Sequence, residues 1–225
     1  MEISPEAENY LKTVYYLETE FSRQVRMMEI ADAIDRTRAS VTRMMQILDE
    51  RNLVEYTKYK GVELTNDGEQ IALKLVRKHR LIETFLTEHL GIPWADVHEE
   101  ADRLEHYLSD RFADHLAEYL GDPEINPHGD PIPDSELSFP FDPSHTPLVE
   151  CEVDETLVVE QVPHRQSGVR KYLFENEIDP GATLTVDEIA PVGLINVIVE
   201  ESDTPVSIPM HVARQVGVNR VISTG

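Results

Sequence analysis

The sequence is poor in cysteine, in long apolar runs and in basic residues, and each shortage excludes a class of protein. Cys151 is the only cysteine among 225 residues, which excludes an intramolecular disulfide and a cysteine-rich zinc site. We expect this thiol to be a buried apolar residue rather than a reactive one. No apolar run reaches the roughly 18 residues of a transmembrane helix, so we expect a cytoplasmic protein with no membrane partner.

Acidic residues outnumber basic ones by 43 to 20, and a net charge of −23 argues against nucleic acid as a partner. The imbalance is uneven, however. Residues 1–65 hold 9 basic and 12 acidic side chains, whereas residues 66–225 hold 11 and 31. The stretch from Arg36 to Leu48 contains three arginines and no acid. We interpret this pattern as adaptation to a salt-rich, halophilic cytoplasm that spares one functional segment.

The first 65 residues have the pattern of a winged helix-turn-helix. Ser4 and Pro5 are typical of a helix start, and an apolar stripe follows them. A short helix is predicted over 28–34 and a third over 38–51, capped by Thr37. Two β-prone runs then flank a turn that contains Gly61, which predicts a hairpin.

The third helix is the expected DNA-recognition helix. Its polar face carries side chains that can hydrogen-bond base edges and phosphates, namely Arg38, Ser40, Thr42, Arg43 and Gln46. Lys58 and Lys60 at the hairpin tip are expected to touch a flanking phosphate or the minor groove, while Tyr56 and Tyr59 are expected to pack. An amphipathic helix with a merely solvated face is the alternative.

The rest of the chain divides into a helical part and a β-rich part. Helices are predicted from Asn66, as the cap residue, to about Leu90, over 94–109 and over 111–120. Prolines are dense from Pro123 to Pro147, and short β-prone runs follow. We therefore predict an α+β, mainly α fold. Its parts are a winged helix-turn-helix at 1–65, a helical metal-binding and dimerisation domain at 66–136, a linker at 137–149 and an SH3-like β-barrel at 150–225.

Histidines and acids of the helical part share helix faces. His79 and Glu83 are four residues apart, and the next predicted helix carries a stripe of His98, Asp102, Glu105 and His106. Two facing helices with such side chains can surround a cation. Nitrogen and oxygen donors without thiolate suit Mn²⁺ or Fe²⁺ and also Zn²⁺, Co²⁺ or Ni²⁺. In a chain so rich in acids, surface ion pairs are the alternative.

With these features the sequence resembles the diphtheria toxin repressor family of metal-dependent regulators, closely over 4–136 and loosely over 150–225. The resemblance rests on Tyr10–Tyr15, Ala39–Thr42, Leu64–Gly68, Arg77–Leu81, Val97–Ala101, Leu104–Ser109 and Asn126–Pro133. It implies a homodimer whose winged helices bind double-stranded operator DNA when metal is bound. The implied function is a transcriptional regulator, a repressor of metal-ion homeostasis genes.

The resemblance also implies two metal sites per subunit. His79, Glu83 and His98 match an ancillary site, and Asp102, Glu105 and His106 match a regulatory site. The latter takes a further ligand from the first helix, which falls at Asn9, with Glu8 as the alternative. Iron-type relatives have cysteine where this chain has Asp102, so the resemblance favours Mn²⁺ over Fe²⁺.

The C-terminal part resembles the family's SH3-like domain and the small domain of ferrous-iron transport proteins. In some relatives this domain lends two ligands to the ancillary site, which fall near Gln166 and Val169 here. Because valine has no donor atom, His164 or Glu160 is the alternative.

Two other functions remain open. One is a winged-helix regulator with a non-metal effector, in which the histidines and acids form ion pairs. The other is a metallohydrolase, against which stands the absence of an HExxH motif and of a nucleophile with a base. Ser144-His145 falls in the proline-rich connection and is expected at the surface. We therefore do not expect an enzyme.

Overall fold

The computed structural model describes residues 3–58, 60–141, 145–163, 166–200, 202 and 204–221. The chain forms two compact units. Unit 1 contains residues 1–79, 104–115 and 133–138, and unit 2 contains 80–103, 116–132 and 139–225. The boundary passes through one continuous helix between His79 and Arg80. The predicted α+β fold class is confirmed.

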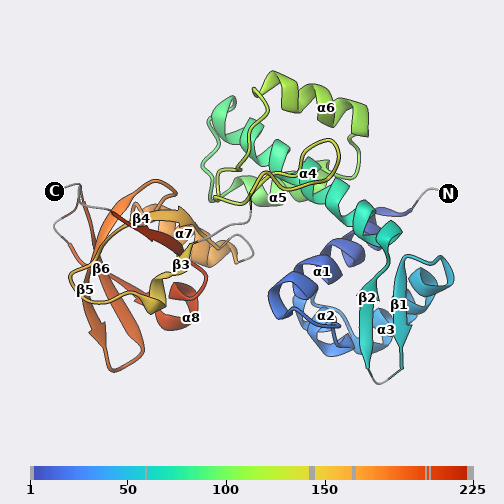
Figure 1. Ribbon diagram of the computed structural model, residues 1–225, viewed down its shortest axis with the longest axis horizontal. Helices are drawn as coiled ribbons and strands as arrows, with labels where there is room; N and C mark the ends of the chain where they lie inside the picture. The colour runs from blue at the N-terminus through green and yellow to red at the C-terminus, as the bar shows by residue number, and fades with distance from the viewer. Residues whose placement is uncertain are drawn as a thin grey trace. The chain divides into compact units, whose positions relative to one another are not determined.

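The N-terminal part of unit 1 has the predicted order of three helices and a hairpin (Figure 1). The elements are α1 (Pro5–Phe21), α2 (Met27–Ala33), α3 (Arg38–Glu50), β1 (Val54–Thr57) and β2 (Gly61–Leu64). The Ser4 side chain accepts a hydrogen bond from the Ala7 amide, and Thr37 caps α3 through the Ser40 amide. The capping residues identified in the sequence therefore do start these two helices.

Apolar faces of the three helices form one core. Leu11, Val14, Ile30, Val41 and Leu48 are completely buried in it. The hairpin packs here because Val25 and Val62 exchange backbone hydrogen bonds. Gly61 has a φ of +146°, and a Cβ there would lie 2.6 Å from the Val25 carbonyl oxygen, so only glycine fits at this turn.

Three further helices follow, α4 (Asn66–Glu88), α5 (Val97–Leu104) and α6 (Asp110–Tyr119). The prediction of Asn66 as the cap of α4 is wrong: the Thr65 hydroxyl accepts the Gly68 amide at 3.1 Å. The prediction of one helix over 94–109 is also wrong, because α5 ends at Leu104. Ser109 caps α6 by accepting the Phe112 amide at 3.1 Å. A new helix start at Ser109 competes with extension of α5, which leaves Glu105 and His106 in a turn.

The proline-rich segment after α6 begins as ordered, buried structure within unit 2. An isolated bridge pairs Ile125 with Pro131. Between them, Asn126, His128 and Asp130 are at most 4% exposed. The Asn126 side chain accepts the amides of His128 and Asp130 at 3.1 and 2.7 Å. We call residues 126–130 the Asn126 loop.

The C-terminal part of unit 2 is a six-stranded antiparallel sheet in the order β3-β8-β4-β5-β6-β7. Two short helices accompany it (Figure 1). In chain order the elements are β3 (Thr146–Pro147), the 3₁₀ turn η1 (Leu148–Glu150), β4 (Thr156–Gln161), α7 (Ser167–Glu175), β5 (Thr183–Ala190), β6 (Leu194–Val199), β7 (Val206–Pro209), α8 (Met210–Ala213) and β8 (Gly217–Arg220). Helix α7 was not predicted from the sequence.

Alternating apolar residues of the strands form the core of this sheet. Leu157, Val186 and Val197 are completely buried in it. Cys151 belongs to the same core, as predicted, and burial raises the pKa of its thiol. Among the described helices, none combines the length and apolar character needed to cross a membrane.

Candidate metal centre

The first candidate metal site is built around the carboxylate of Glu105, which is completely buried. The Lys12 ammonium of α1 lies 2.6 and 2.8 Å from its two oxygens. His79 Nδ1 of α4 lies 2.6 Å from Oε2 of the same carboxylate. A carboxylate only accepts, so Nδ1 carries the hydrogen in this contact. Neither Lys12 nor its contact was singled out from the sequence, because only residues with metal-ligand chemistry were weighed.

His106 lies next to Glu105 and is oriented by α1. Its Nδ1 is 2.6 Å from Oε2 of Glu8, and its Nε2 is 3.6 Å from Oε1 of Glu105. Nε2 is buried and has no hydrogen-bond partner among the described residues. A buried imidazole nitrogen without such a partner, beside a carboxylate oxygen, fits a metal ligand.

Of the two remaining residues expected at this site, Asn9 points to solvent and Asp102 joins the cluster. Asn9 is exposed, and its backbone carbonyl accepts the Thr13 hydroxyl at 2.8 Å. The side chain of α1 that reaches His106 is thus Glu8, the alternative from the sequence. Asp102 is brought together with His79 and Glu105, with one ligand atom of each within 4.8 Å of the others.

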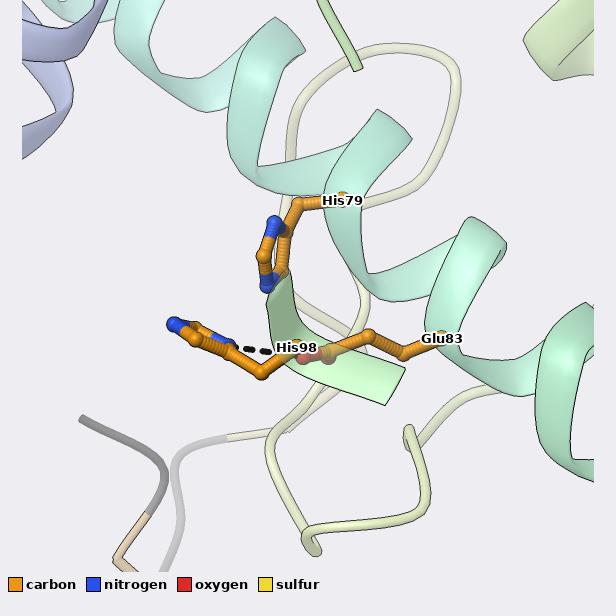
Figure 2. A group of neighbouring side chains, drawn as sticks. All are labelled: His79, Glu83 and His98. Carbon is orange, nitrogen blue, oxygen red and sulfur yellow. Dashed lines mark hydrogen bonds and ion pairs between the residues drawn. The ribbon is translucent and has the colours of Figure 1, made fainter. Parts of the chain in front are cut away.

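A second group consists of His79, Glu83 and His98, with ligand atoms also within 4.8 Å of one another. Figure 2 shows their side chains converging from α4 and α5. His98 Nδ1 lies 3.0 Å from Oε1 of Glu83, as the dashed line marks. His79 and Glu83 are one turn apart on the continuous helix α4, which fixes their separation.

The Asn126 loop holds Glu83 through its other carboxylate oxygen, Oε2. Asn126 Nδ2 donates to Oε2 of Glu83 at 2.7 Å, and His128 Nδ1 lies 3.5 Å from the same oxygen. His128 Nε2 donates to the Trp94 carbonyl at 3.0 Å. Partners of this kind orient a metal-ligating carboxylate. From the sequence this loop was recognisable only as part of the family resemblance, and no role was predicted for it.

The same loop is attached to the C-terminal sheet. The Val162 amide donates to the His128 carbonyl at 2.9 Å, and the Gln161 side chain donates to Asp130 at 2.5 Å. Arg170 of α7 is completely buried, and its Nε donates to the Ala95 carbonyl at 3.0 Å. Through these contacts, all within unit 2, the sheet supports the residues around Glu83.

Among the described residues, the ligands expected from the C-terminal part join neither group of histidines and acids. Gln166 is exposed, and Val169 packs against the core of the sheet. Glu160 is exposed as well, whereas His164 falls outside the described residues. The donors that do come together are imidazole nitrogens and carboxylate oxygens, a set that fits Mn²⁺ or Fe²⁺.

Helix α3, the predicted recognition helix, presents its polar face to solvent. Arg38, Ser40, Arg43 and Gln46 are exposed, as are Lys58 and Lys60 beside the hairpin turn. Thr42 is only partly exposed, and its hydroxyl donates to the Arg38 carbonyl at 2.8 Å. Tyr56 packs against the core, whereas Tyr59 lies outside the described residues.

A winged helix together with buried clusters of histidine and carboxylate defines the class of metal-responsive DNA-binding regulators. Comparison with known families agrees with this class. Residues 2–62 match the model for the N-terminal DNA-binding domain of iron-dependent repressors, and residues 65–134 match the metal-binding and dimerisation domain. Residues 146–220 match the FeoA domain.

The chain belongs to the iron-dependent repressor family that includes the diphtheria toxin repressor, as its sequence indicated. It is 30% identical to the iron-dependent repressor IdeR of Mycobacterium leprae, over 95% of this chain and 96% of that protein. It is 37% identical to the regulator MntR of Oceanobacillus iheyensis, over 53% of this chain and 82% of that protein. A solved manganese-dependent transcriptional repressor in complex with manganese has a TM-score of 0.84 at 30% identity, covering 96% of this chain and 100% of that one.

Proposed function

We propose that this protein is a homodimeric transcriptional repressor that binds operator DNA when Mn²⁺ occupies the cluster around Glu105. The relatives include both iron-dependent and manganese-dependent repressors. The carboxylate of Asp102 favours Mn²⁺, since hard oxygen donors suit that ion. In this proposal residues 1–65 bind DNA, residues 66–136 bind metal and form the dimer, and residues 150–225 support the metal-binding part.

Two sets of ligands are assigned. His106, Glu105 and Asp102 hold the regulatory ion, and Glu8 of α1, rather than Asn9, orients His106. His79, Glu83 and His98 hold an ancillary ion, and Asn126 fixes the Glu83 carboxylate. The buried Nε2 of His106, which lacks a hydrogen-bond partner among the described residues, is the observation that carries the assignment of the regulatory ion.

Helix α1 is the element through which metal would act on DNA binding. One face of α1 carries Leu11 and Val14 into the core of the winged helix. Glu8 on the same helix contacts His106. His106 lies in the turn just before α6, whose first backbone hydrogen bond is accepted by the Ser109 carbonyl. A metal ion at His106 would therefore restrict the positions open to α1 and favour the population competent to bind DNA. Typical coupling of about 1–3 kcal/mol gives roughly 5–150-fold in affinity.

The DNA contacts are assigned to α3 and the hairpin. Arg38, Arg43 and Gln46, which are exposed, would read base edges. Ser40 and Thr42 would assist them, and Lys58 and Lys60 would contact phosphates. Purely electrostatic binding weakens by about 0.9 in log K per phosphate and per unit of log salt. In a salt-rich cytoplasm, base contacts and dimer geometry must supply more of the affinity.

The test is selective binding to fragments of the organism's own genome in near-molar KCl, with Mn²⁺, with Fe²⁺ or with chelator. We expect retention of a few fragments with Mn²⁺ and its loss with chelator. His106→Gln should abolish the metal-stimulated binding, whereas the matched variant His211→Gln, which changes an exposed histidine of α8, should bind as the wild type does.

Each alternative gives a different result. Retention that depends on Fe²⁺ alone would keep the function and change the metal. Equal retention with chelator would leave a DNA-binding protein whose histidines and acids form ion pairs. Unchanged metal dependence in a folded His106→Gln variant would reject the assigned regulatory site.

A further inference from the structure

We propose that Lys12 is an internal competitor of the metal ion, a cation of the chain itself that must leave Glu105 before metal can bind there. This inference rests on the proposed function, because it concerns the same carboxylate. It adds a residue whose charge sets the metal concentration at which the protein responds.

The contacts of Lys12 are those of a cation in a binding site. Its Nζ lies 2.6 Å from Oε1 and 2.8 Å from Oε2 of Glu105, so one ammonium group engages both oxygens. The Glu105 side chain is 0% exposed and the Lys12 side chain 11% exposed. Water therefore contributes little to screening this pair, and the ammonium provides the main compensation for a buried carboxylate charge.

A metal ion at Glu105 and the Lys12 ammonium exclude one another. A divalent ion bound to a carboxylate oxygen would stand within a few ångströms of Nζ, and two cations at such a distance repel strongly where solvent is scarce. Lysine has a flexible four-carbon stem, and this side chain is slightly exposed, so it has a route away from the carboxylate. Metal binding thus exchanges one cation of Glu105 for another.

The exchange has two consequences of opposite sign. Without metal, Lys12 stabilises the folded chain by neutralising Glu105, so removing the ammonium lowers stability. With metal, the same ammonium opposes binding, so removing it raises metal affinity. A side chain with a merely structural role would lower both.

The experiment compares Lys12→Gln with Lys78→Gln in the full-length chain, by Mn²⁺ titration calorimetry and by thermal unfolding with chelator. Lys78 is a matched control because its Nζ pairs with Asp110 at 2.8 Å and its side chain is 15% exposed. Both lysines belong to unit 1. We expect Lys12→Gln to bind Mn²⁺ at least about tenfold more tightly, since one unfavourable charge contact of this kind commonly changes an equilibrium tenfold or more. Both variants should unfold at a lower temperature than the wild type, but Lys78→Gln should keep the wild-type Mn²⁺ affinity.

A folded Lys12→Gln variant with unchanged or weaker Mn²⁺ affinity would overturn the proposal. If Lys12→Gln does not fold, Lys12→Arg takes its place, because a guanidinium can pair with both oxygens in fixed geometry. We expect Lys12→Arg to bind Mn²⁺ more weakly than the wild type, and equal or tighter binding would overturn the proposal. A wild-type chain that binds no Mn²⁺, Fe²⁺ or other divalent ion would instead reject the proposed function itself.

Discussion

Oε2 of Glu8 lies 2.6 Å from Nδ1 of His106, although the two residues are 98 positions apart in the chain. The contact leaves His106 Nε2 directed to the buried side of the cluster, 3.6 Å from Glu105. Asn9, the neighbouring residue of α1, is exposed. Position on the helix surface, rather than proximity in sequence, therefore decides which side chain of α1 contacts His106.

We predict that Glu8→Ala weakens Mn²⁺ binding by about tenfold, whereas Asn9→Ala changes it by less than about twofold. Partners that orient a metal-ligating histidine typically account for 10–100-fold in metal affinity. Mn²⁺ titration of both folded variants measures the difference. A large loss in Asn9→Ala with none in Glu8→Ala would restore the assignment made from the family resemblance.

Much of unit 1 could be predicted because its signals are local. Ser4 and Thr37 cap the helices that they were expected to cap, and α3 buries the predicted face through Val41, Met45 and Leu48. Caps and apolar periodicity depend on residues a few positions apart, so one sequence suffices to recognise them. The histidines and acids of the candidate metal centre were identified from their helical spacing and the family resemblance.

The remaining features depend on residues distant in the sequence. The spacing of His98, Asp102, Glu105 and His106 suggested one helix, but α5 ends at Leu104. Glu105 is directed inward by Lys12 and His79, 93 and 26 residues away. No periodicity encodes such pairs. Helix α7 was missed for a similar reason. From the sequence alone its Arg170 is expected at the surface, but it is fully buried and donates to the Ala95 carbonyl.

The contact between the Asn126 loop and β4 requires glycine at one position. Gly129 has a φ of +88°, and a Cβ there would lie 1.9 Å from the Glu160 carbonyl oxygen. Gly121 has a similar φ of +79° but no atom within 4 Å of such a Cβ. A side chain at either position would strain the left-handed backbone, but only at position 129 would it also collide with a neighbouring atom.

We predict that Gly129→Ala lowers the free energy of unfolding by about 3 kcal/mol and Gly121→Ala by about 1 kcal/mol, as expected for a backbone clash added to left-handed strain. Chemical denaturation of both variants gives the comparison. Because the loop also holds Glu83 through Asn126, Gly129→Ala should weaken Mn²⁺ binding as well. Equal stability of the two variants would show that the loop does not need its close approach to β4.

Glu18 of α1 links the stability of the winged helix to pH. Its Oε1 accepts the Leu64 amide at 3.0 Å. Burial, the largest cause, raises the pKa of this carboxyl from 4.5 to about 7, the Leu64 amide opposes the shift, and the nearby acids Glu63 and Glu69 add to it. The proton is therefore held more tightly in the folded chain than in the unfolded one.

The sign of the pH effect follows from the raised pKa. Stability that depends on protonated Glu18 is fully present below pH 4.5 and is lost as the pH rises through about 7. We predict that Glu18→Gln, which keeps an acceptor for Leu64 without a charge, stabilises the chain at pH 8 by about 1 kcal/mol, a value reduced for the half-exposed site. Near pH 5 the gain should be close to zero. Denaturant unfolding at both pH values measures it, with the exposed Glu6→Gln of the same helix as the control. A gain in Glu18→Gln that is equal at pH 5 and pH 8 would show that the benefit of glutamine comes from packing, because a titrating carboxyl must make it depend on pH.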